Sequence, residues 1–304
     1  MIDSFGRVLY TRWDHLEREQ DNVSGATHNP RNYPNEEADQ YSSSVSGYDQ
    51  DVFPEISNTG QHDFVSGSVW DTPHTFERFF IWMMNPDGRE LETINHFGRQ
   101  ETTGYIGAST AFGSEESHHG GDIPSGMKAV SNMFQISEDI HTPGVYYFTD
   151  APRTDTHAAG QILEMVAPPG FDATTQMQIN DVTHPDTDSP TSSPSSQHSG
   201  FYRDPLRLSS GMMISAWTSN TDYEGNTGSD THPQSKFDFR LVEINESGSY
   251  ATAGAFITPQ ITKSVSQQGQ SQKNWGTQGP VWHYNGPLWQ LQPREVRPRQ
   301  RPPI

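Results

Sequence analysis

Hydrophobic residues in this chain fall in short runs that are separated by long polar stretches. The run Phe79–Met84 is six large apolar residues without alternation, which predicts a strand covered on both faces. The next four residues, Asn85-Pro86-Asp87-Gly88, are typical of a tight turn, because proline fixes φ and glycine accepts a left-handed conformation. From Arg89 to Ile94 charged and apolar residues alternate, as in a strand with one exposed face. The pattern predicts a hairpin with a buried first strand and a more exposed second strand.

This hairpin fits two architectures. In a four-stranded β-propeller blade, burial decreases from the axis to the rim, and the hairpin would be the outer half of such a blade. An ordinary β-sandwich hairpin is the alternative, and this stretch alone does not choose between them. A further strand-like run, Gly6–Trp13, precedes it. The intervening residues 14–75 are polar, and a segment of this length predicts a functional insertion or a mobile loop.

Two later parts of the chain match each other. Each has four strand-like runs in the same order, with a short link after the first run and a longer polar loop after the second. The runs of one unit are residues 133–139, 144–151, 160–167 and 175–183, and those of the other are residues 200–211, 212–219, 237–245 and 250–258. An internal repeat of about 70 residues is typical of propellers, solenoids or repeat arrays.

Incomplete units flank these two. Gly6–Trp13 and the Phe79 hairpin supply runs two to four of an earlier unit that lacks its first strand, and Val281–Val296 begins a last unit. We predict an all-β fold of four-stranded antiparallel propeller blades with WD40-like repeats, about four recognisable units over residues 1–296 and a Pro/Arg-rich linker at 297–304. A closed propeller takes about 4 to 8 blades. The chain is therefore predicted to be a partial propeller or a fragment with long polar loops.

Composition supports a folded core and limits the partners. Hydrophobic residues make up 31% and aromatic residues 11%, which is too aromatic for a disordered chain. The formal net charge of −19 argues against nucleic acid as a partner, because phosphate contacts need a basic surface. The absence of cysteine excludes disulfides and covalent haem attachment through C-x-x-C-H. No run has the length of a membrane span, and the N-terminus has no signal-peptide pattern.

Histidines and aspartates recur just before the third run of each unit. The motif Asp-Thr-His occurs twice and Asp-Thr-Pro-His once, in loops that open on one face of a propeller. Histidine and aspartate together suit Zn, Cu, Ni or Fe. The alternative is that each motif is an Asx or Thr turn, with the histidine packed against the next blade. The candidate ligand or partner face comprises Asp71, His74, Asp155, His157, Asp230, His232, His96 and His184.

The best local metal candidate lies in the polar stretch between residues 98 and 131. Its residues are Glu115, Glu116, His118, His119 and Asp122. Adjacent histidines in a strand point apart, so a solvated loop is the alternative. Carboxylates are numerous but solvated, and no acid–base pair stands out as catalytic.

Seven segments together carry a likeness to a known family. They are GRVLYTRWDHLEREQ, FFIWMMNPDGRELETINHFGRQE, NMFQISED, DTHAAGQI, GFYRDPLRLSSG, KFDFRL and LWQLQPREVRPR. In their order they resemble the middle β-propeller region of proteins related to the alpha subunit of hydrazine synthase. The resemblance implies a propeller between other domains of a larger periplasmic or extracellular protein. Some relatives are nitrogen-metabolism oxidoreductases that carry c-type haems in flanking domains and make hydrazine from nitric oxide and ammonium.

The missing cysteine separates this chain from that chemistry. Without C-x-x-C-H no haem is attached here, so no catalytic residue is carried across. We therefore expect a non-catalytic scaffold or interaction domain that binds flanking domains or another protein subunit. One alternative is a metal-dependent hydrolase or lyase that uses a divalent metal on the His-rich face. A second alternative is a glycan-binding module whose stacking platforms are Trp13, Trp70, Trp217 and Trp282.

Overall fold

The computed structural model describes residues 1–18, 30–31, 75–89, 91–97, 128, 130–152, 155–172, 176–270 and 278–297 of the 304-residue chain. Regular structure in these ranges is β-strand except for two short 3-10 turns, η3 (Ile94–His96) and η4 (Pro185–Thr187). The predicted all-β fold is therefore confirmed. Across the same ranges, no helix is long and apolar enough to cross a membrane.

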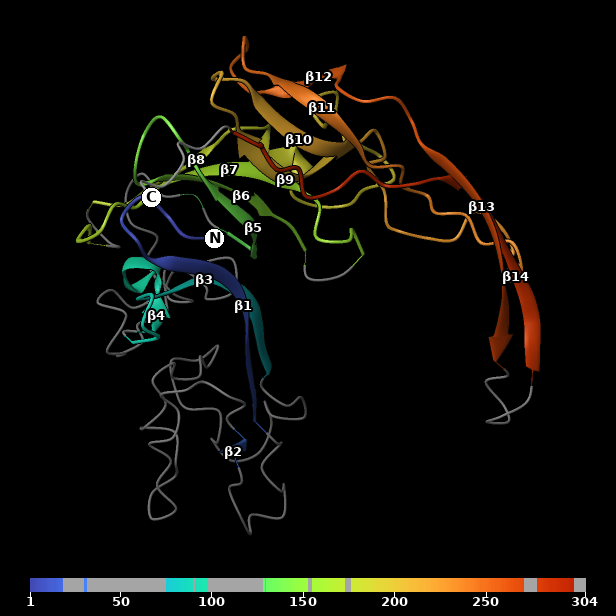
Figure 1. Cartoon of the computed structure of the whole chain (residues 1–304), viewed down its shortest axis with the longest axis horizontal. Helices are drawn as coiled ribbons and strands as arrows, with labels where there is room; N and C mark the ends of the chain where they lie inside the picture. Colours follow the sequence, from blue (N-terminus) through green and yellow to red (C-terminus); the bar gives the residue numbers. More distant parts are fainter. Residues whose placement is uncertain are drawn as a thin grey trace, which may run out of the picture.

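The described strands form three four-stranded antiparallel sheets and one two-stranded sheet. The first sheet, in the order β2-β1-β3-β4, contains β1 (Val8–Arg18), β2 (Pro30–Arg31), β3 (Thr75–Met84) and β4 (Glu92–Thr93). The second contains β5 (Met133–Glu138), β6 (Val145–Asp150), β7 (Gln161–Val166) and β8 (Gln178–Asp181). The third contains β9 (Phe201–Arg207), β10 (Met213–Thr218), β11 (Arg240–Asn245) and β12 (Thr252–Phe256). The second sheet lies between the first and the third (Figure 1).

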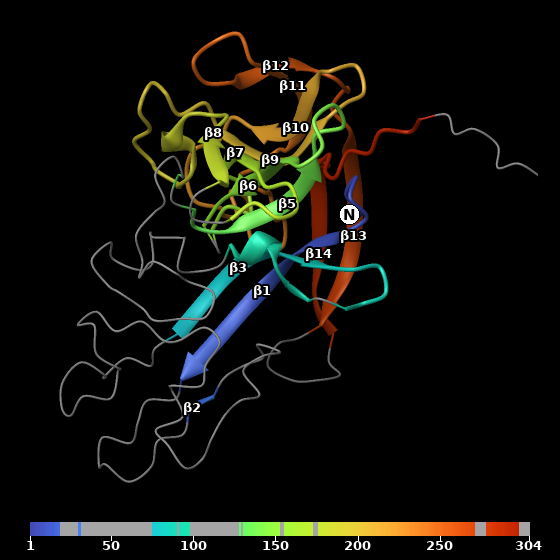
Figure 2. The ribbon, with the colours of Figure 1, turned by 90° about the vertical axis from the view of Figure 1, so that its left-hand side faces the viewer.

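The predicted hairpin lies on one side of the first sheet. β3 pairs antiparallel with β1 along the length of the strand (Figure 2). On its other edge it pairs with β4. Phe80, Ile81 and Trp82 are consecutive and almost fully buried, so both faces of β3 are covered there, as predicted. The turn also forms as predicted, with Gly88 at φ 82. β1 and β3 extend into the two ends of the polar segment 14–75, most of which lies outside the described residues.

The return strand is much shorter than the alternating pattern predicted. Only Glu92–Thr93 pairs with β3, and the chain then turns into η3 with Asn95 at φ 51. Thr93, Ile94 and Asn95 are all buried, which an alternating strand would not produce. The reason is a polar interaction in the interior: the Asn95 side chain accepts a hydrogen bond from Arg7 at 3.1 Å and donates one to the Pro168 carbonyl at 2.9 Å.

The two matching units form the second and third sheets. In each unit the four strands pair in chain order as an antiparallel meander. Every one of the eight strands lies inside the run that the sequence predicted for it. The sequence repeat is therefore also a structural repeat.

The first strand of each unit contains the same irregularity. In β5 and in β9 two residues lie opposite one residue of the next strand, which is a β-bulge. One residue of each bulge is left-handed, Gln135 with φ 51 in β5 and Asp204 with φ 54 in β9. Gln292, at φ 53, is the corresponding residue of the segment that follows the last strand. Left-handed residues other than glycine are uncommon, so three at matching positions indicate a common local structure.

Neighbouring units also join through matching contacts. The backbone N and Oγ of Ser4 donate to the Glu138 carboxylate at 2.7 and 2.6 Å. Ser209 makes the same two bonds to Glu295, with its backbone N at 3.1 Å. Glu138 and Glu295 each follow the left-handed residue of their segment by three positions. Residues 289–295 therefore take the place that a first strand occupies in the earlier units.

A second pair of matching contacts supports this assignment. Gly160, just before β7, exchanges backbone hydrogen bonds of 2.9 Å with Tyr202 in β9. Just before β11, the Phe239 carbonyl accepts from the Gln290 N–H, also at 2.9 Å. Tyr202 and Gln290 both lie two residues before the left-handed residue of their segment.

The N-terminus supplies part of a strand that was predicted to be missing. Met1 and Leu9 exchange hydrogen bonds between backbone N and O at 2.6 and 2.8 Å, and Ile2 bridges to Val8. A short piece of first strand is thus present beside β1.

The prediction for the last unit needs correction. Val281–Pro287 lies in β14 (Gln278–Pro287), which pairs with β13 (Thr262–Gln270) in the two-stranded sheet. This hairpin extends away from the three larger sheets (Figure 1). The sequence predicted no strand at β13, because Val265 is the one large apolar residue in a run of Ser, Gln, Thr, Lys and Gly, so no alternation marks it.

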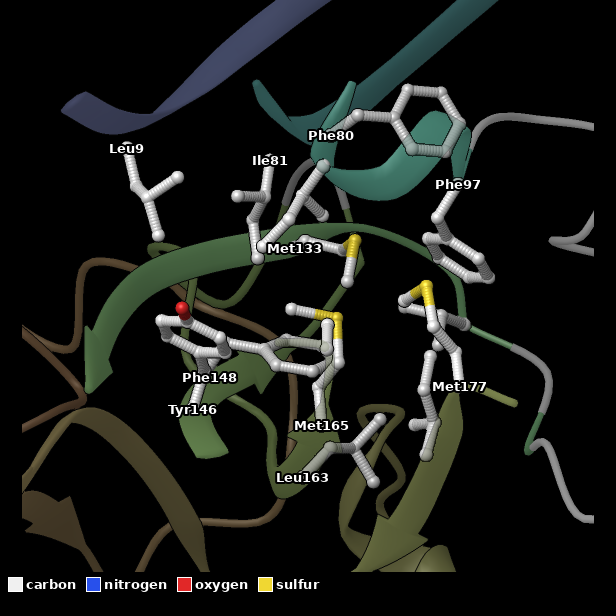
Figure 3. Close-up of a cluster of buried hydrophobic side chains, with 14 of the residues drawn as sticks. Leu9, Phe80, Ile81, Phe97, Met133, Tyr146, Phe148, Leu163, Met165 and Met177 are labelled. Carbon is white, nitrogen blue, oxygen red and sulfur yellow. The ribbon is translucent and has the colours of Figure 1, made fainter. Parts of the chain in front are cut away.

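Large buried side chains fill the spaces between the sheets. Leu9 and Ile81 of the first sheet face Tyr146, Phe148 and Leu163 of the second, with the methionines Met133, Met165 and Met177 beside them (Figure 3). A second cluster joins the second and third sheets through residues such as Tyr147 and Met213. A third packs Trp289 and Leu291 against Phe239. Burial between the sheets is the main force that holds the units in place.

Candidate functional site

The loop before β7 has the most unusual backbone among the described histidine loops. Asp155, His157 and Ala158 all have positive φ, at 75, 56 and 55. Two side chains from the first strands hold it: Arg203 Nη1 donates to the His157 carbonyl at 2.6 Å, and Gln135 Nε2 donates to the Ala158 carbonyl at 3.1 Å. Such strain persists only where the surroundings fix the chain, so this loop is rigidly placed.

The His157 ring pairs with a carboxylate and packs against aromatic rings. Its Nε2 lies 2.8 Å from Glu224 Oε2, and both side chains are 38% exposed. Trp289 and Phe237 meet the ring edge-on, with centroids 4.8 and 5.6 Å away. A histidine–carboxylate pair open to water can hold or transfer a proton. It links the second unit to the third, because Glu224 N also donates to the Asp155 carbonyl at 2.7 Å.

The second described motif has a different environment. The His232 ring stacks on His283 of β14, with centroids 5.0 Å apart and planes inclined by 22°. The Nδ1 atoms of the two rings interact with hydroxyl groups, His232 with Thr231 at 3.1 Å and His283 with Ser266 at 2.7 Å. Nitrogen lone pairs lie in the ring plane, so stacked rings do not aim them at a common point. The pair is therefore poorly arranged to share a metal.

The two described motifs are alike in sequence but not in structure. Ser229 closes the His232 turn, because its backbone O and Oγ accept from the His232 N–H at 3.1 and 3.2 Å. An Asx turn would instead have had the Asp230 carboxylate accept the backbone hydrogen bond. The Thr156 hydroxyl was expected to bond the backbone, yet it is buried without a hydrogen-bond partner. β7 begins four residues after His157, whereas β11 begins eight residues after His232. The unequal spacing gives the two loops different paths.

Of the remaining histidines of the predicted face, His184 has a described side chain, and it does not join these. His184 caps η4, accepting from Asp186 N at 3.1 Å through Nδ1, and packs on Tyr250 at 4.7 Å. His96 lies in η3, and its side chain is outside the described part of the chain. Also outside the described residues are Asp71, His74, Glu115, Glu116, His118, His119 and Asp122. Among the residues that are described, no three His, Asp or Glu side chains are arranged to hold a metal ion.

Buried charges lie at the joints between units. Arg7 donates through Nε to Asp3 Oδ2 at 2.8 Å and through Nη2 to the Tyr146 hydroxyl at 2.7 Å, so it ties the first sheet to the second. Burial raises the pKa of Tyr146 above its usual value. Sequence analysis did not identify this cluster, because an Arg next to a Gly before a strand has no distinctive spacing.

A similar cluster ties the second sheet to the third. Arg207 Nη2 donates to Glu246 Oε1 at 2.7 Å and to the Tyr147 hydroxyl at 3.1 Å. The Glu246 carboxylate raises the pKa of Arg207, and burial raises the pKa of Tyr147 to about 12. Both clusters keep their charges paired, which suits a structural role better than proton transfer near neutral pH.

The tryptophans proposed as glycan platforms differ in exposure. Trp217 is packed in the cluster between the second and third sheets and donates through Nε1 to the Ser199 carbonyl at 2.8 Å. Trp282, on β14, is 48% exposed. Trp70 and the side chain of Trp13 lie outside the described residues. Trp282 is thus the candidate with a free ring face among those described.

Comparison with known proteins gives no assignment: no family model, no curated protein and no solved structure matches this chain.

Proposed function

We propose that this chain is an arc of a β-propeller that serves as a non-catalytic scaffold and interaction domain. The observation that carries the proposal is the repeated joint between units: Ser4 with Glu138 and Ser209 with Glu295 make the same pair of hydrogen bonds. Equivalent joints between successive antiparallel sheets are what rotation about a common axis produces. Three matching left-handed residues, one in each first strand or its equivalent, support the same arrangement.

The distribution of polar groups favours a scaffold over an enzyme. The buried ion pair of Arg7 with Asp3 lies between the first and second sheets, and the partly exposed pair of His157 with Glu224 joins two loops. An enzyme needs groups that converge on a substrate position. The scaffold is expected to bind flanking domains or another protein subunit.

The resemblance to hydrazine synthase alpha-subunit proteins extends this proposal. In that setting the chain belongs to a larger exported protein, and any haem is attached to other segments, because this one has no cysteine. The neighbouring reading frames test the relation. A C-x-x-C-H motif encoded next to this chain supports it, and a genomic context without any haem-binding or exported segment contradicts it.

Metal analysis of the purified protein separates the scaffold from a metal-dependent hydrolase or lyase. We expect no stoichiometric Zn, Cu or Fe, and no change in metal content in His157→Ala or His232→Ala, because each ring already has a local partner. The double substitution His118→Ala with His119→Ala tests the remaining metal candidate. A stoichiometric metal that is lost in any of these variants, measured by inductively coupled plasma mass spectrometry, would favour the enzyme.

A further inference from the structure

The hairpin β13–β14 forms a two-stranded sheet of its own. β13 and β14 are hydrogen-bonded to each other, from Thr262 opposite Pro287 at one end to Gln270 opposite Gln278 at the other. It projects beyond the three larger sheets (Figure 1). An isolated two-stranded ribbon is marginally stable in water and normally needs a surface to pack against. We call these two strands, β13 and β14, the arm.

Apolar side chains of the arm are exposed. Val265, Val281 and Trp282 are 48%, 41% and 48% exposed. Residues directly opposite each other in an antiparallel pair share a face, so Val265 and Trp282 lie on one face with Tyr284 and Gln267. The His232 ring stacks on the His283 ring and covers part of the other face, and the Thr231 carbonyl accepts from His283 N at 2.8 Å along the edge of β14. The face with Trp282 is the one left for a partner.

The charge of the arm is opposite to that of the body. The chain has 38 acidic residues, yet the 48 residues from Ser247 to Arg294 contain none of them. That stretch has three basic residues, Lys263, Lys273 and Arg294, so the net charge of −19 divides into +3 for the stretch and −22 for the remainder. Because this stretch has no carboxylates and the rest of the chain is strongly acidic, the two are electrostatically complementary.

Acidic side chains are exposed on the unit from which the arm extends. On the third sheet and its loops the exposed acidic residues are Glu224, Asp230, Asp238, Glu243 and Glu246. Arm and acidic surface thus belong to one unit. In a two-fold symmetric pair, the arm of each copy can therefore lie on the third unit of the other, and the contact is made twice.

We propose that the arm docks on the third unit of a second copy of this chain, so that two copies exchange arms. This inference rests on the proposed interaction role and names the partner. The repulsion between two bodies of like charge is screened beyond about 8 Å at physiological ionic strength, whereas the arm contact acts at a few ångströms. Trp282 is the central anchor, and Lys263 provides charge complementarity at the base of the arm.

Sedimentation or light scattering of the whole chain at 0.15 M salt tests the proposal. The wild-type chain is expected to form a dimer, and Trp282→Ser to weaken it at least tenfold, because buried tryptophans are typical anchors of interfaces. Phe5→Ser is the matched control, since Phe5 is an aromatic residue that is 46% exposed in the N-terminal turn, outside the arm and the third unit. It is expected to leave the dimer unchanged.

A charge reversal gives a second test that does not depend on the arm's apolar packing. Lys263→Glu is expected to weaken the dimer at least tenfold, whereas Arg89→Glu, the same change of charge on the turn after β3, is expected to have little effect. Equal weakening by both would show that overall repulsion governs association and would overturn the arm contact.

The remaining outcomes are equally decisive. A monomeric wild-type chain overturns the proposal but not the scaffold, since metal content is measured independently of oligomeric state. If that monomer were retained on immobilised neutral glycans and lost retention in Trp282→Ser, the arm would be a glycan platform instead. A dimer that tolerates all four substitutions would also place the interface elsewhere.

Discussion

Several residues hold conformations or charges that are unfavourable by themselves, and each has a local partner that stabilises it. Asp204 is left-handed, and its carboxylate accepts from the Gln292 N–H at 3.1 Å and from Arg203 Nε at 3.2 Å. Asp150 is fully buried and accepts from the backbone N–H of Ser131 and Asn132 at 2.9 and 3.0 Å. At the residue scale, the joints between units depend on such paired polar groups.

Burial makes Asp150 sensitive to pH. Loss of hydration raises the pKa of its carboxyl from 3.8 to about 7, against the opposing effects of the two N–H donors and Lys128. Because the folded-state pKa is the higher one, the stabilising contribution is complete below pH 3.8 and is lost as the pH rises through 7. Asp188 is the other charged group that acts on it, and it raises the pKa further.

Asp150→Asn should therefore change the pH profile of stability. The amide oxygen can still accept from the two N–H groups but carries no charge. Between pH 5.5 and 8.5 the free energy of unfolding of the wild type is expected to fall by about 2 kcal/mol more than that of the variant. This is the contribution of the interval from pH 5.5 to the folded-state pKa of about 7, at about 1.4 kcal/mol for each pH unit. Urea unfolding at both pH values measures this, and parallel profiles for the two proteins would contradict the assignment.

At the scale of elements, two glycines with the same conformation have different surroundings. Gly200, before β9, has φ 96, and a Cβ there would lie 2.2 Å from the Thr218 carbonyl oxygen. Gly211, in the turn before β10, has φ 88 and no atom within 4 Å of an added Cβ. At Gly200 both the close approach of the chain and the left-handed conformation require glycine. At Gly211 the left-handed conformation alone requires it.

Alanine at these positions separates the two effects. Gly211→Ala should lower the free energy of unfolding by about 1–2 kcal/mol, the cost of a left-handed L-residue. Gly200→Ala should cost about 1–3 kcal/mol more, because the backbone of β9 must shift away from β10. Thermal or urea unfolding of the pair gives the comparison. Equal losses would show that the Gly200 site can relax at no cost.

The arm illustrates an element that hydrophobic periodicity does not reveal. β13 lacks an alternating pattern, and its pairing with β14 was not predicted. The sequence feature that distinguishes the arm is its charge, since no acidic residue occurs between Glu246 and Glu295. A search for stretches that depart from the overall charge would have found it.

At the scale of the whole molecule, stability depends on how the units are joined. Arg7 is the centre of the first joint, with its guanidinium bonded to Asp3, Asn95 and Tyr146. The side chains of Arg7 and Asp3 are 10% and 0% exposed. Removing the cation would leave a buried carboxylate without its partner.

Arg7→Met is therefore expected to destabilise the protein by about 3–5 kcal/mol, the usual cost of breaking one side of a buried ion pair. Arg89→Met is the control, because Arg89 is 83% exposed and its substitution should change stability by less than about 0.5 kcal/mol. Chemical unfolding of both variants provides the measurement. If the two arginines proved equally dispensable, the joint would not be held by this cluster.

The sequence by itself determined the strands and their repetition. Alternation and apolar runs located all eight strands of the two matching units, and the Pro-Asp-Gly turn located the hairpin after β3. These features are local, because a strand needs only the right side-chain period and a turn only the right φ preferences. For the same reason the all-β class followed directly from the sequence.

The tertiary structure decided what the histidine motifs do. Asp155-Thr156-His157 and Asp230-Thr231-His232 look like one repeated element, yet one is a strained loop paired with Glu224 and the other a turn stacked on the arm. Their partners come from residues distant in sequence, and no local pattern specifies them. The joints between units were likewise decided by long-range contacts, since Ser4 and Glu138 are brought together only when the two sheets pack.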